Sequence, residues 1–148
     1  MIESNKINDF LNSWRDGIIR IGKVYLENGD YKVSAEKFIE AHYAFDGESV
    51  LFKPTFTKEV IFRNSKDIAL SYFIGGSIKE DHGFALKPWE QILIEELNIL
   101  EENELKIAMG IFKLKPINEE EIISVAFTFV FTENNDYLKI KVHHSSPI

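Results

Sequence analysis

The C-terminal stretch IISVAFTFVFTENNDYLKIKVHHSSPI, residues 122–148, decides the fold, because it contains two apolar segments joined by a turn signal. Ile122 to Thr132 and Tyr137 to Val142 are rich in β-branched and aromatic residues, which favours strands. Asn134, Asn135 and Asp136, which lie between the two segments, are typical of a hairpin turn. The stretch therefore predicts an antiparallel hairpin.

More strands are expected upstream of this hairpin. One is expected from Gln91 to Ile99. The surrounding segment from Glu90 to Glu102 is ambiguous, because its Glu and Leu residues also suit a helix, but it has neither a cap nor a clean helical stripe. We interpret it as a strand. The other segments expected to form strands are Val50 to Phe52, Val60 to Phe62, Gly83 to Leu86 and Leu105 to Leu114.

Helices are expected before most of the strands. From Ile7 to Leu26 the apolar residues recur every three or four positions, as on an amphipathic helix. A second helix is expected from Val33 to Phe45. A third, from Ile68 to Ile74, follows Ser65 as a candidate N-cap and ends at a pair of glycines.

Helices followed by antiparallel strands indicate an α+β fold, in which the N-terminal helices pack on one face of a strongly curved, cone-shaped sheet. This order resembles the folds of nuclear transport factors and of SnoaL-type cyclases. The length of 148 residues and the 45% hydrophobic content suit one compact domain, residues 1–148.

Charge and composition exclude several classes of function. The net charge is −7, from 17 basic and 24 acidic residues, so nucleic acid and anionic membranes are not expected partners. The chain contains no cysteine, which excludes disulfides, thiolate nucleophiles and thiolate zinc sites. The N-terminal residues are polar and no apolar run is long enough to span a bilayer, so we expect a cytoplasmic protein.

His143, His144, Ser145 and Ser146 place two imidazoles and two hydroxyls at the end of an apolar strand. Alternation along a regular strand directs His144 and Ser146 inward, together with Leu138, Ile140 and Val142. A β-bulge would reverse this and direct His143 and Ser145 inward. Both arrangements are open at the level of sequence.

Other candidate groups are scattered along the chain. Thr55 follows a proline that restricts the backbone, and Tyr72 and Ser71 lie on the short third helix. Arg63 is a candidate for anion recognition, although an exposed arginine in an ion pair is as well supported. The four histidines have no metal-site spacing, which favours a metal-free site.

Ordered motifs along nearly the whole chain resemble the iota-class carbonic anhydrase family. They run from Trp14 in the first expected helix to Pro147 near the end of the sequence. The motifs are Trp14-Arg15-Asp16-Gly17, Phe52-Lys53-Pro54-Thr55, Phe62-Arg63, Ser71-Tyr72-Phe73, Ala108-Met109-Gly110 and His143-His144-Ser145-Ser146.

The resemblance implies an enzyme that interconverts carbon dioxide and bicarbonate, with no cofactor or, as in other members, manganese or zinc. It implies that Thr55, Tyr72 and one of Ser145 and Ser146 hold bicarbonate, while His143 or His144 orients or relays a proton. A homodimer is also implied. The alternative is a non-catalytic module of the same fold that binds a small ligand or forms oligomers.

Overall fold

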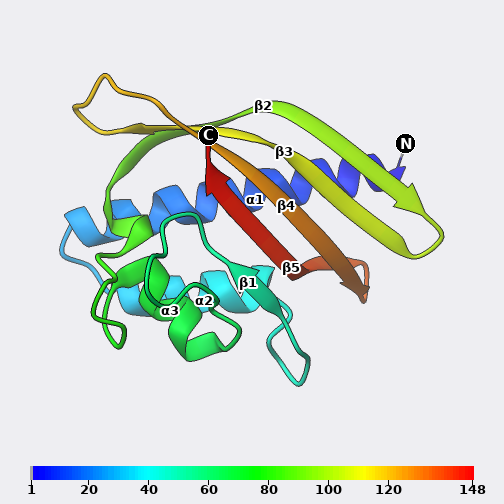
Figure 1. Ribbon diagram of the computed structural model, residues 1–148, viewed down its shortest axis with the longest axis horizontal. Coiled ribbons are helices and arrows are strands. Elements are labelled where there is room, and N and C mark those ends of the chain that lie inside the picture. Colours follow the sequence, from blue (N-terminus) through cyan, green and yellow to red (C-terminus); the bar gives the residue numbers. More distant parts are fainter. Residues whose placement is uncertain (1) are drawn as a thin grey trace.

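The computed structural model describes residues 2–148 and confirms an α+β architecture (Figure 1). In these residues, three α-helices and a short 3-10 helix accompany one five-stranded sheet. The helices are α1 (Ile2–Leu26), α2 (Tyr31–His42), α3 (Lys66–Ile74) and the 3-10 helix η1 (Phe84–Leu86). The strands are β1 (Leu51–Lys53), β2 (Trp89–Glu102), β3 (Leu105–Pro116), β4 (Ile123–Asn134) and β5 (Tyr137–Pro147).

The predicted apolar stripe of α1 is its buried face. Of its members, Ile7, Phe10, Leu11, Trp14, Ile18 and Ile21 are buried, whereas Tyr25 in the last turn is 41% exposed. Helix α2 packs beside it, and a Cβ atom added to Gly17 would lie 2.5 Å from the ring of Phe38. The glycine therefore allows the two helices to approach closely.

Helix α2 begins two residues earlier than the sequence pattern predicts. The Asp30 carboxylate accepts a hydrogen bond from the Val33 amide at 3.2 Å, which caps the helix so that Tyr31 is its first residue. The helix ends at His42, and Tyr43 adopts extended backbone angles. Tyr43 also forms an isolated bridge with Ile140 of β5, so the expected continuation to Phe45 is wrong.

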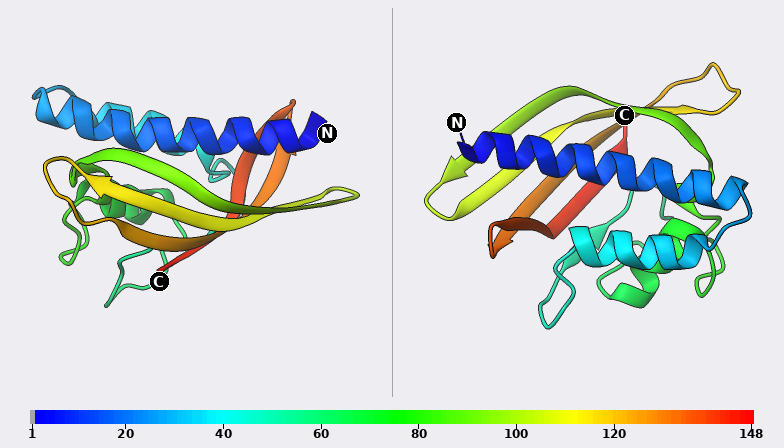
Figure 2. Two further views of the ribbon diagram at one scale, coloured as in Figure 1. Left: turned by 90° about the horizontal axis from the view of Figure 1, so that it is seen from above. Right: turned by 180° about the vertical axis from the view of Figure 1, so that it is seen from behind.

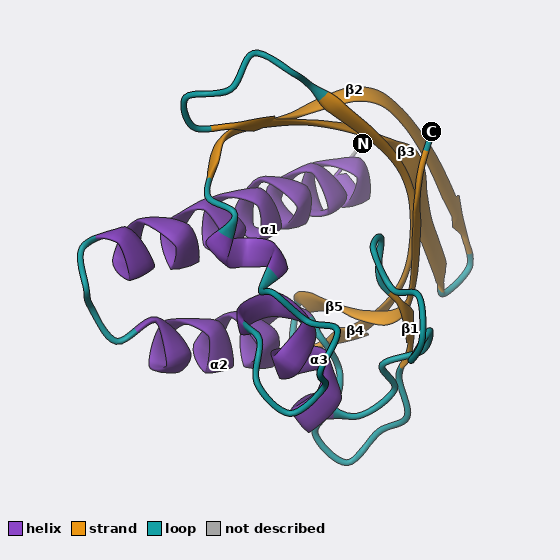
Figure 3. Cartoon of the chain, turned by 60° about the vertical axis from the view of Figure 1, so that its left-hand side comes forward, coloured by secondary structure: helices purple, strands orange, loops and turns teal. Residues whose placement is uncertain are grey.

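The sheet has the order β1-β5-β4-β3-β2, with β1 parallel to β5 and all the other neighbours antiparallel. Figure 2 shows α1 lying along one face of the sheet, and Figure 3 shows the strands curving around the helices. The buried core fills the space between these two layers. The expected curved sheet covered by helices is confirmed.

The β4–β5 hairpin is confirmed, and its turn has a clear chemical basis. Asn135 and Asp136 form the two-residue loop with φ angles of 53° and 69°. Two successive left-handed residues match the twist of the adjoining strands, and Asn and Asp tolerate that conformation better than most residues.

A bulge in β2 contributes to the curvature of the sheet. Its register with β3 shifts between Ile94 and Glu96, which pair with Phe112 and Ile111, and the next β3 residue is Gly110. A Cβ atom added to Gly110 would lie only 2.2 Å from the Glu96 carbonyl oxygen. Gly110 is therefore the residue that lets the two strands approach at the bulge.

Two of the expected short strands are wrong. Val60, Ile61 and Phe62 lie in a loop, where the Val60 amide donates to the Glu80 carboxylate at 2.8 Å. This amide is therefore used by a side chain and not by a neighbouring strand. The segment from Gly83 to Leu86 is a turn with the 3-10 helix η1.

Within residues 2–148, no helix has the length and apolar character that crossing a membrane would require. Helix α1 is long, but it is amphipathic: its apolar stripe packs on the sheet and its other face is polar.

Candidate active site

A bulge in β5 determines which C-terminal residues face the helices. Ile140 pairs with Phe131 and Val142 pairs with Val130, so Lys141 has no partner on β4. This extra residue reverses the alternation of the strand. His143 and Ser145 are consequently buried, whereas His144 is exposed. Of the two arrangements open at the level of sequence, the structure has the one with the bulge.

The buried pair lines a small cavity between the sheet and the helices, here called the central cavity. Its polar lining includes Thr55, Tyr72, His143 and Ser145, and its volume is about 10 Å³. Such a space holds about one water-sized molecule. The rest of the lining is mainly apolar and includes Phe52, Phe73, Phe84, Phe112, Leu114 and Val125.

His143 is held on all sides. Its Nδ1 atom lies 2.9 Å from the Tyr43 hydroxyl and its Nε2 atom lies 2.6 Å from the Ser145 hydroxyl. The ring stacks on Phe52 with centroids 4.6 Å apart, and the edge of Phe129 meets it at the same distance. Burial lowers the pKa of His143 well below its ordinary value, so the imidazole is neutral at neutral pH.

Tyr43 was not expected at the site, although it lies directly behind His143. Its hydroxyl accepts a hydrogen bond from the Trp14 indole at 3.2 Å and contacts His143. Its side chain is 1% exposed. The apolar stripe predicts that Trp14 is buried, but no sequence pattern brings Tyr43 to β5, because this contact spans 100 residues.

Thr55 and Tyr72 meet at the other side of the central cavity. The Tyr72 hydroxyl accepts a hydrogen bond from the Phe56 amide at 3.2 Å, so this amide does not use the hydroxyl hydrogen. Burial raises the pKa of Tyr72 by more than its hydrogen bonds to the Phe56 amide and the Thr55 side chain lower it. Tyr72 is therefore a neutral donor, and it lines the central cavity together with Thr55 and Ser145.

His144 and Ser146 lie on the opposite face of the sheet. They line a shallow depression there together with Met109 and Thr128. The Lys53 ammonium group donates to the Ser145 carbonyl at 2.7 Å and reaches the Ser146 hydroxyl at 3.4 Å. His144 and Ser146 are therefore separated from the central cavity by the backbone of β5.

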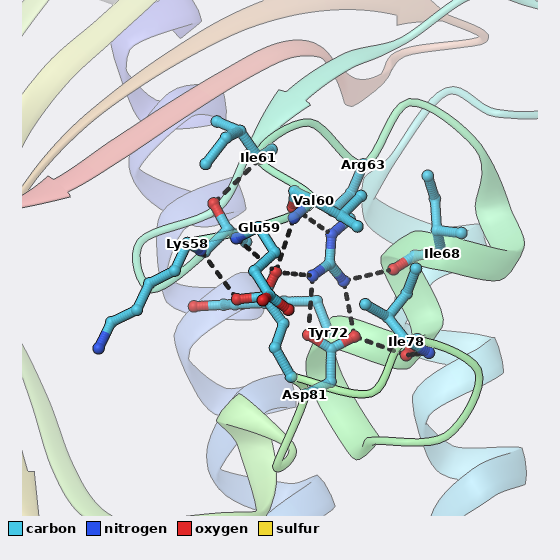
Figure 4. A network of polar contacts seen from close by, with 12 residues as sticks. Lys58, Glu59, Val60, Ile61, Arg63, Ile68, Tyr72, Ile78 and Asp81 are labelled. Carbon is cyan, nitrogen blue, oxygen red and sulfur yellow. Dashed lines mark hydrogen bonds and ion pairs between the residues drawn. The ribbon is translucent and has the colours of Figure 1, made fainter.

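Arg63 is fully buried in an ion pair, and Figure 4 shows its guanidinium group enclosed by its partners. It donates to both oxygens of Asp81, at 2.7 and 2.8 Å, and to the carbonyls of Val60 and Ile68. The Ser71 hydroxyl donates to the same Asp81 carboxylate at 2.5 Å. Neither Arg63 nor Ser71 lines the central cavity, so the geometry does not support the substrate contacts expected of them.

Arg63 nevertheless contacts a residue of the site, Tyr72. Its guanidinium carbon lies 5.9 Å from the centre of the Tyr72 ring, in cation–π contact. By joining the loop at Val60 to Asp81, it holds the two segments that flank Tyr72. We therefore assign Arg63 to the wall that positions Tyr72.

The remaining histidines do not reach the central cavity. His42 is buried, with Nδ1 2.7 Å from the Phe38 carbonyl oxygen and Nε2 2.8 Å from the Ser13 hydroxyl. His82 is exposed in a loop. In the described part of the chain, no three His, Asp or Glu side chains are grouped so that they could hold a metal ion.

A larger groove adjoins the central cavity and is here called the outer groove. It has a volume of about 390 Å³ and is lined in part by Glu80, His82 and Lys87. Tyr72 and Phe84 line both spaces, and their rings stack 5.6 Å apart. These two rings therefore form the wall between the outer groove and the central cavity.

The central cavity combines neutral hydrogen-bond donors with apolar, mainly aromatic walls. A space of this size is too small for the larger organic substrate that a cyclase would need. Hydroxyl donors in an apolar environment stabilise negative charge that develops on a bound oxygen atom. The arrangement suits a small, apolar substrate that becomes an oxyanion.

The comparisons with known proteins agree with this chemistry. The family model described as metal-independent carbonic anhydrase matches residues 5–147. A metal-independent carbonic anhydrase of Nostoc sp. (strain PCC 7120) is 31% identical over 140 residues, which cover 90% of this chain and 68% of the Nostoc protein.

Solved structures give the same result. The crystal structure of a cyanobacterial iota-carbonic anhydrase complexed with bicarbonate has a TM-score of 0.90 and 29% identity, and the match covers 96% of this chain and 90% of the other. An NTF2-like protein from Pseudomonas putida KT2440 has a TM-score of 0.63 and 12% identity, covering 96% and 84%. This second similarity is one of fold alone.

Proposed function

The chain belongs to the family of metal-independent carbonic anhydrases, and from this premise we propose that it interconverts carbon dioxide and bicarbonate in the central cavity. In this proposal Thr55, Tyr72 and Ser145 donate hydrogen bonds to the oxygen atoms of bicarbonate. The observation that carries it is the convergence of these three hydroxyls on one small aromatic cavity.

The apolar walls suit carbon dioxide, which has no net charge and no hydrogen-bond donor. When water adds to its carbon atom, negative charge develops on the oxygen atoms, and donors aimed at those atoms stabilise the transition state. The donors are preorganised, because Tyr72 is held by the Phe56 amide and Ser145 by His143. Positioning and electrostatic stabilisation then supply the catalysis.

The charge balance of the site follows from burial. Tyr72 and His143 are both neutral at neutral pH. Bicarbonate would therefore be bound by neutral hydrogen-bond donors and not by the charge of either side chain. The water oxygen forms the new bond to carbon, and one water proton must leave. None of the four polar groups of the cavity is a strong base, so we assign this proton to a second water molecule or to buffer.

The test is stopped-flow measurement of carbon dioxide hydration before and after exhaustive chelation, with metal analysis of the same samples. We expect activity to survive chelation and to fall sharply in Thr55→Ala and Tyr72→Phe. Wild-type rates in both variants would contradict the assigned donors. Loss on chelation, with recovery on adding one metal, would contradict the metal-free mechanism.

We further propose a homodimer that forms through the outer face of the sheet. Support comes from the large apolar side chains exposed on β2 and β3, among them Leu93, Leu100 and Met109. Light scattering with size-exclusion chromatography tests this, and a monomer at micromolar concentration would contradict it. A cytoplasmic location stays a prediction from the sequence.

A further inference from the structure

Four side chains behind the central cavity form a continuous row of hydrogen bonds. The row runs from Trp14 through Tyr43 and His143 to Ser145, with heavy-atom distances of 3.2, 2.9 and 2.6 Å. All four residues are buried. The direction of each hydrogen bond in this row follows from the chemistry of the groups.

The first bond has only one possible direction, because an indole nitrogen can donate but cannot accept. The Tyr43 oxygen therefore accepts from Trp14. In the described residues, the hydrogen bonds of the Tyr43 hydroxyl are those to Trp14 and His143. A buried hydroxyl hydrogen requires an acceptor, and the Nδ1 atom of His143 is the one within reach.

The state of His143 follows from this bond. If Nδ1 accepts a hydrogen from Tyr43, it carries none of its own, and a neutral imidazole then carries its hydrogen on Nε2. That Nε2–H group donates to the Ser145 oxygen at 2.6 Å. Because burial lowers the pKa of His143, the neutral form is the one present at neutral pH.

The state of Ser145 follows in turn. Its oxygen accepts from His143, so its own hydrogen is free, and its side chain lines the central cavity. We infer that Tyr43 is a positioning residue of this enzyme, which selects the Nε2-protonated form of His143 so that Ser145 presents its hydroxyl hydrogen to the substrate. This inference rests on the proposed function, in which Ser145 is a donor to bicarbonate.

The direction of these hydrogen bonds also decides whether His143 orients Ser145 or acts as a general base. With Nε2 already protonated and Nδ1 engaged by Tyr43, the imidazole has no free lone pair with which to take a proton from water. His143 therefore orients Ser145 and is not a general base. A row of hydrogen bonds that all point the same way also polarises its last donor, which strengthens Ser145.

The first part of the test reads the protonation of His143 directly. Nitrogen-15 NMR of protein labelled at histidine distinguishes the two neutral forms, and the spectrum of His143→Gln assigns the signals. We expect the Nε2-protonated form in the wild type. We expect it also in Ser145→Ala, because Tyr43 and not Ser145 selects it. An Nδ1-protonated His143 in the wild type would overturn the inference.

The second part compares Tyr43→Phe with Tyr31→Phe, a matched loss of one hydroxyl from a tyrosine that does not line the cavity. In Tyr43→Phe we expect a mixture of the two neutral forms and a kcat about tenfold lower, the effect of about one net hydrogen bond. In Tyr31→Phe we expect neither change. A folded Tyr43→Phe with the wild-type form of His143 and wild-type kcat would overturn the inference.

The two proposals fail in different ways. If Ser145→Ala retains full activity, Ser145 is not a donor to bicarbonate, and the proposed function fails at this residue while the NMR result still stands. If Ser145→Ala is inactive and the wild-type His143 is protonated at Nδ1, the proposed function stands and the role of Tyr43 is wrong.

Discussion

His143 and Ser145 are two residues apart on β5, and the Nε2 atom of the first lies 2.6 Å from the hydroxyl oxygen of the second. Residues separated by two positions lie on the same face of a strand. Their neighbours His144 and Ser146 have the same chemistry but lie on the other face. The repeated pair in the sequence is therefore divided between the central cavity and the outer surface.

This division gives a matched pair of variants. We expect Ser145→Ala to lower kcat/KM for carbon dioxide hydration about 100-fold, the typical effect of removing one transition-state donor. Ser146→Ala removes the same atom one position away and should stay within about twofold of the wild type. Stopped-flow assays of both variants make the comparison. Equal losses in the two variants would show that β5 has a different register in solution.

Stability should depend on pH through two buried histidines. Burial lowers the pKa of His42 and, more strongly, of His143, so below about pH 6.5 the unfolded chain takes up more protons at these two positions than the folded protein does. The free energy of unfolding should therefore be flat above about pH 6.5 and fall as the pH drops further, by up to about 1.4 kcal/mol per pH unit for each histidine.

Urea unfolding at several pH values between 8 and 5 tests this expectation. The carboxylates with lowered pKa, such as Glu80, lose their contribution only at lower pH and do not obscure this window. His82→Gln is the control, because His82 is exposed and its replacement should leave the pH profile unchanged. Constant stability from pH 7 to 5 would contradict the neutral, buried state of both histidines.

The buried ion pair behind Tyr72 should be costly to break. Asp81→Asn leaves the buried Arg63 guanidinium without its bidentate partner, and we expect a loss of about 3–5 kcal/mol in the free energy of unfolding. Activity should also fall, because Arg63 contacts the Tyr72 ring.

The control for this variant is an ion pair of similar length on the surface. Lys66 and Glu40 lie 2.8 Å apart and both are exposed, so Glu40→Gln should change stability only slightly. Denaturant unfolding of the two variants in parallel gives the comparison. Similar small losses in the free energy of unfolding of the two variants would show that the ion pair of Asp81 and Arg63 is accessible to water.

Gly110 should tolerate no side chain. In Gly110→Ala the new methyl group would meet the Glu96 carbonyl and the ring of Phe127, and we expect a loss of about 1–3 kcal/mol from this overpacking. Because the clash lies at the bulge of β2, part of the strain should appear as a change in sheet curvature. Thermal unfolding measures the loss, and an unchanged midpoint would contradict the close approach of the strands.

Much of the architecture is contained in local patterns. The apolar stripe from Ile7 to Tyr25 predicts α1, and the alternation around Asn135 and Asp136 predicts the β4–β5 hairpin, because both depend on periodicity and on turn chemistry alone. The segment from Val60 to Phe62 has the composition of a strand but forms a loop. Its Val60 amide donates to Glu80, 20 residues away, which no local pattern reveals.

The sequence by itself determined the fold class, the family motifs and the set of hydroxyl and imidazole groups from which the site is built. Only the tertiary structure decided which of them meet. Lys141 has no partner residue on β4, so His143 and Ser145 face the helices. Tyr43 contacts His143 although 100 residues separate them, and Arg63 pairs with Asp81 outside the central cavity. These outcomes depend on pairing between distant segments, and side-chain composition does not specify such pairing locally.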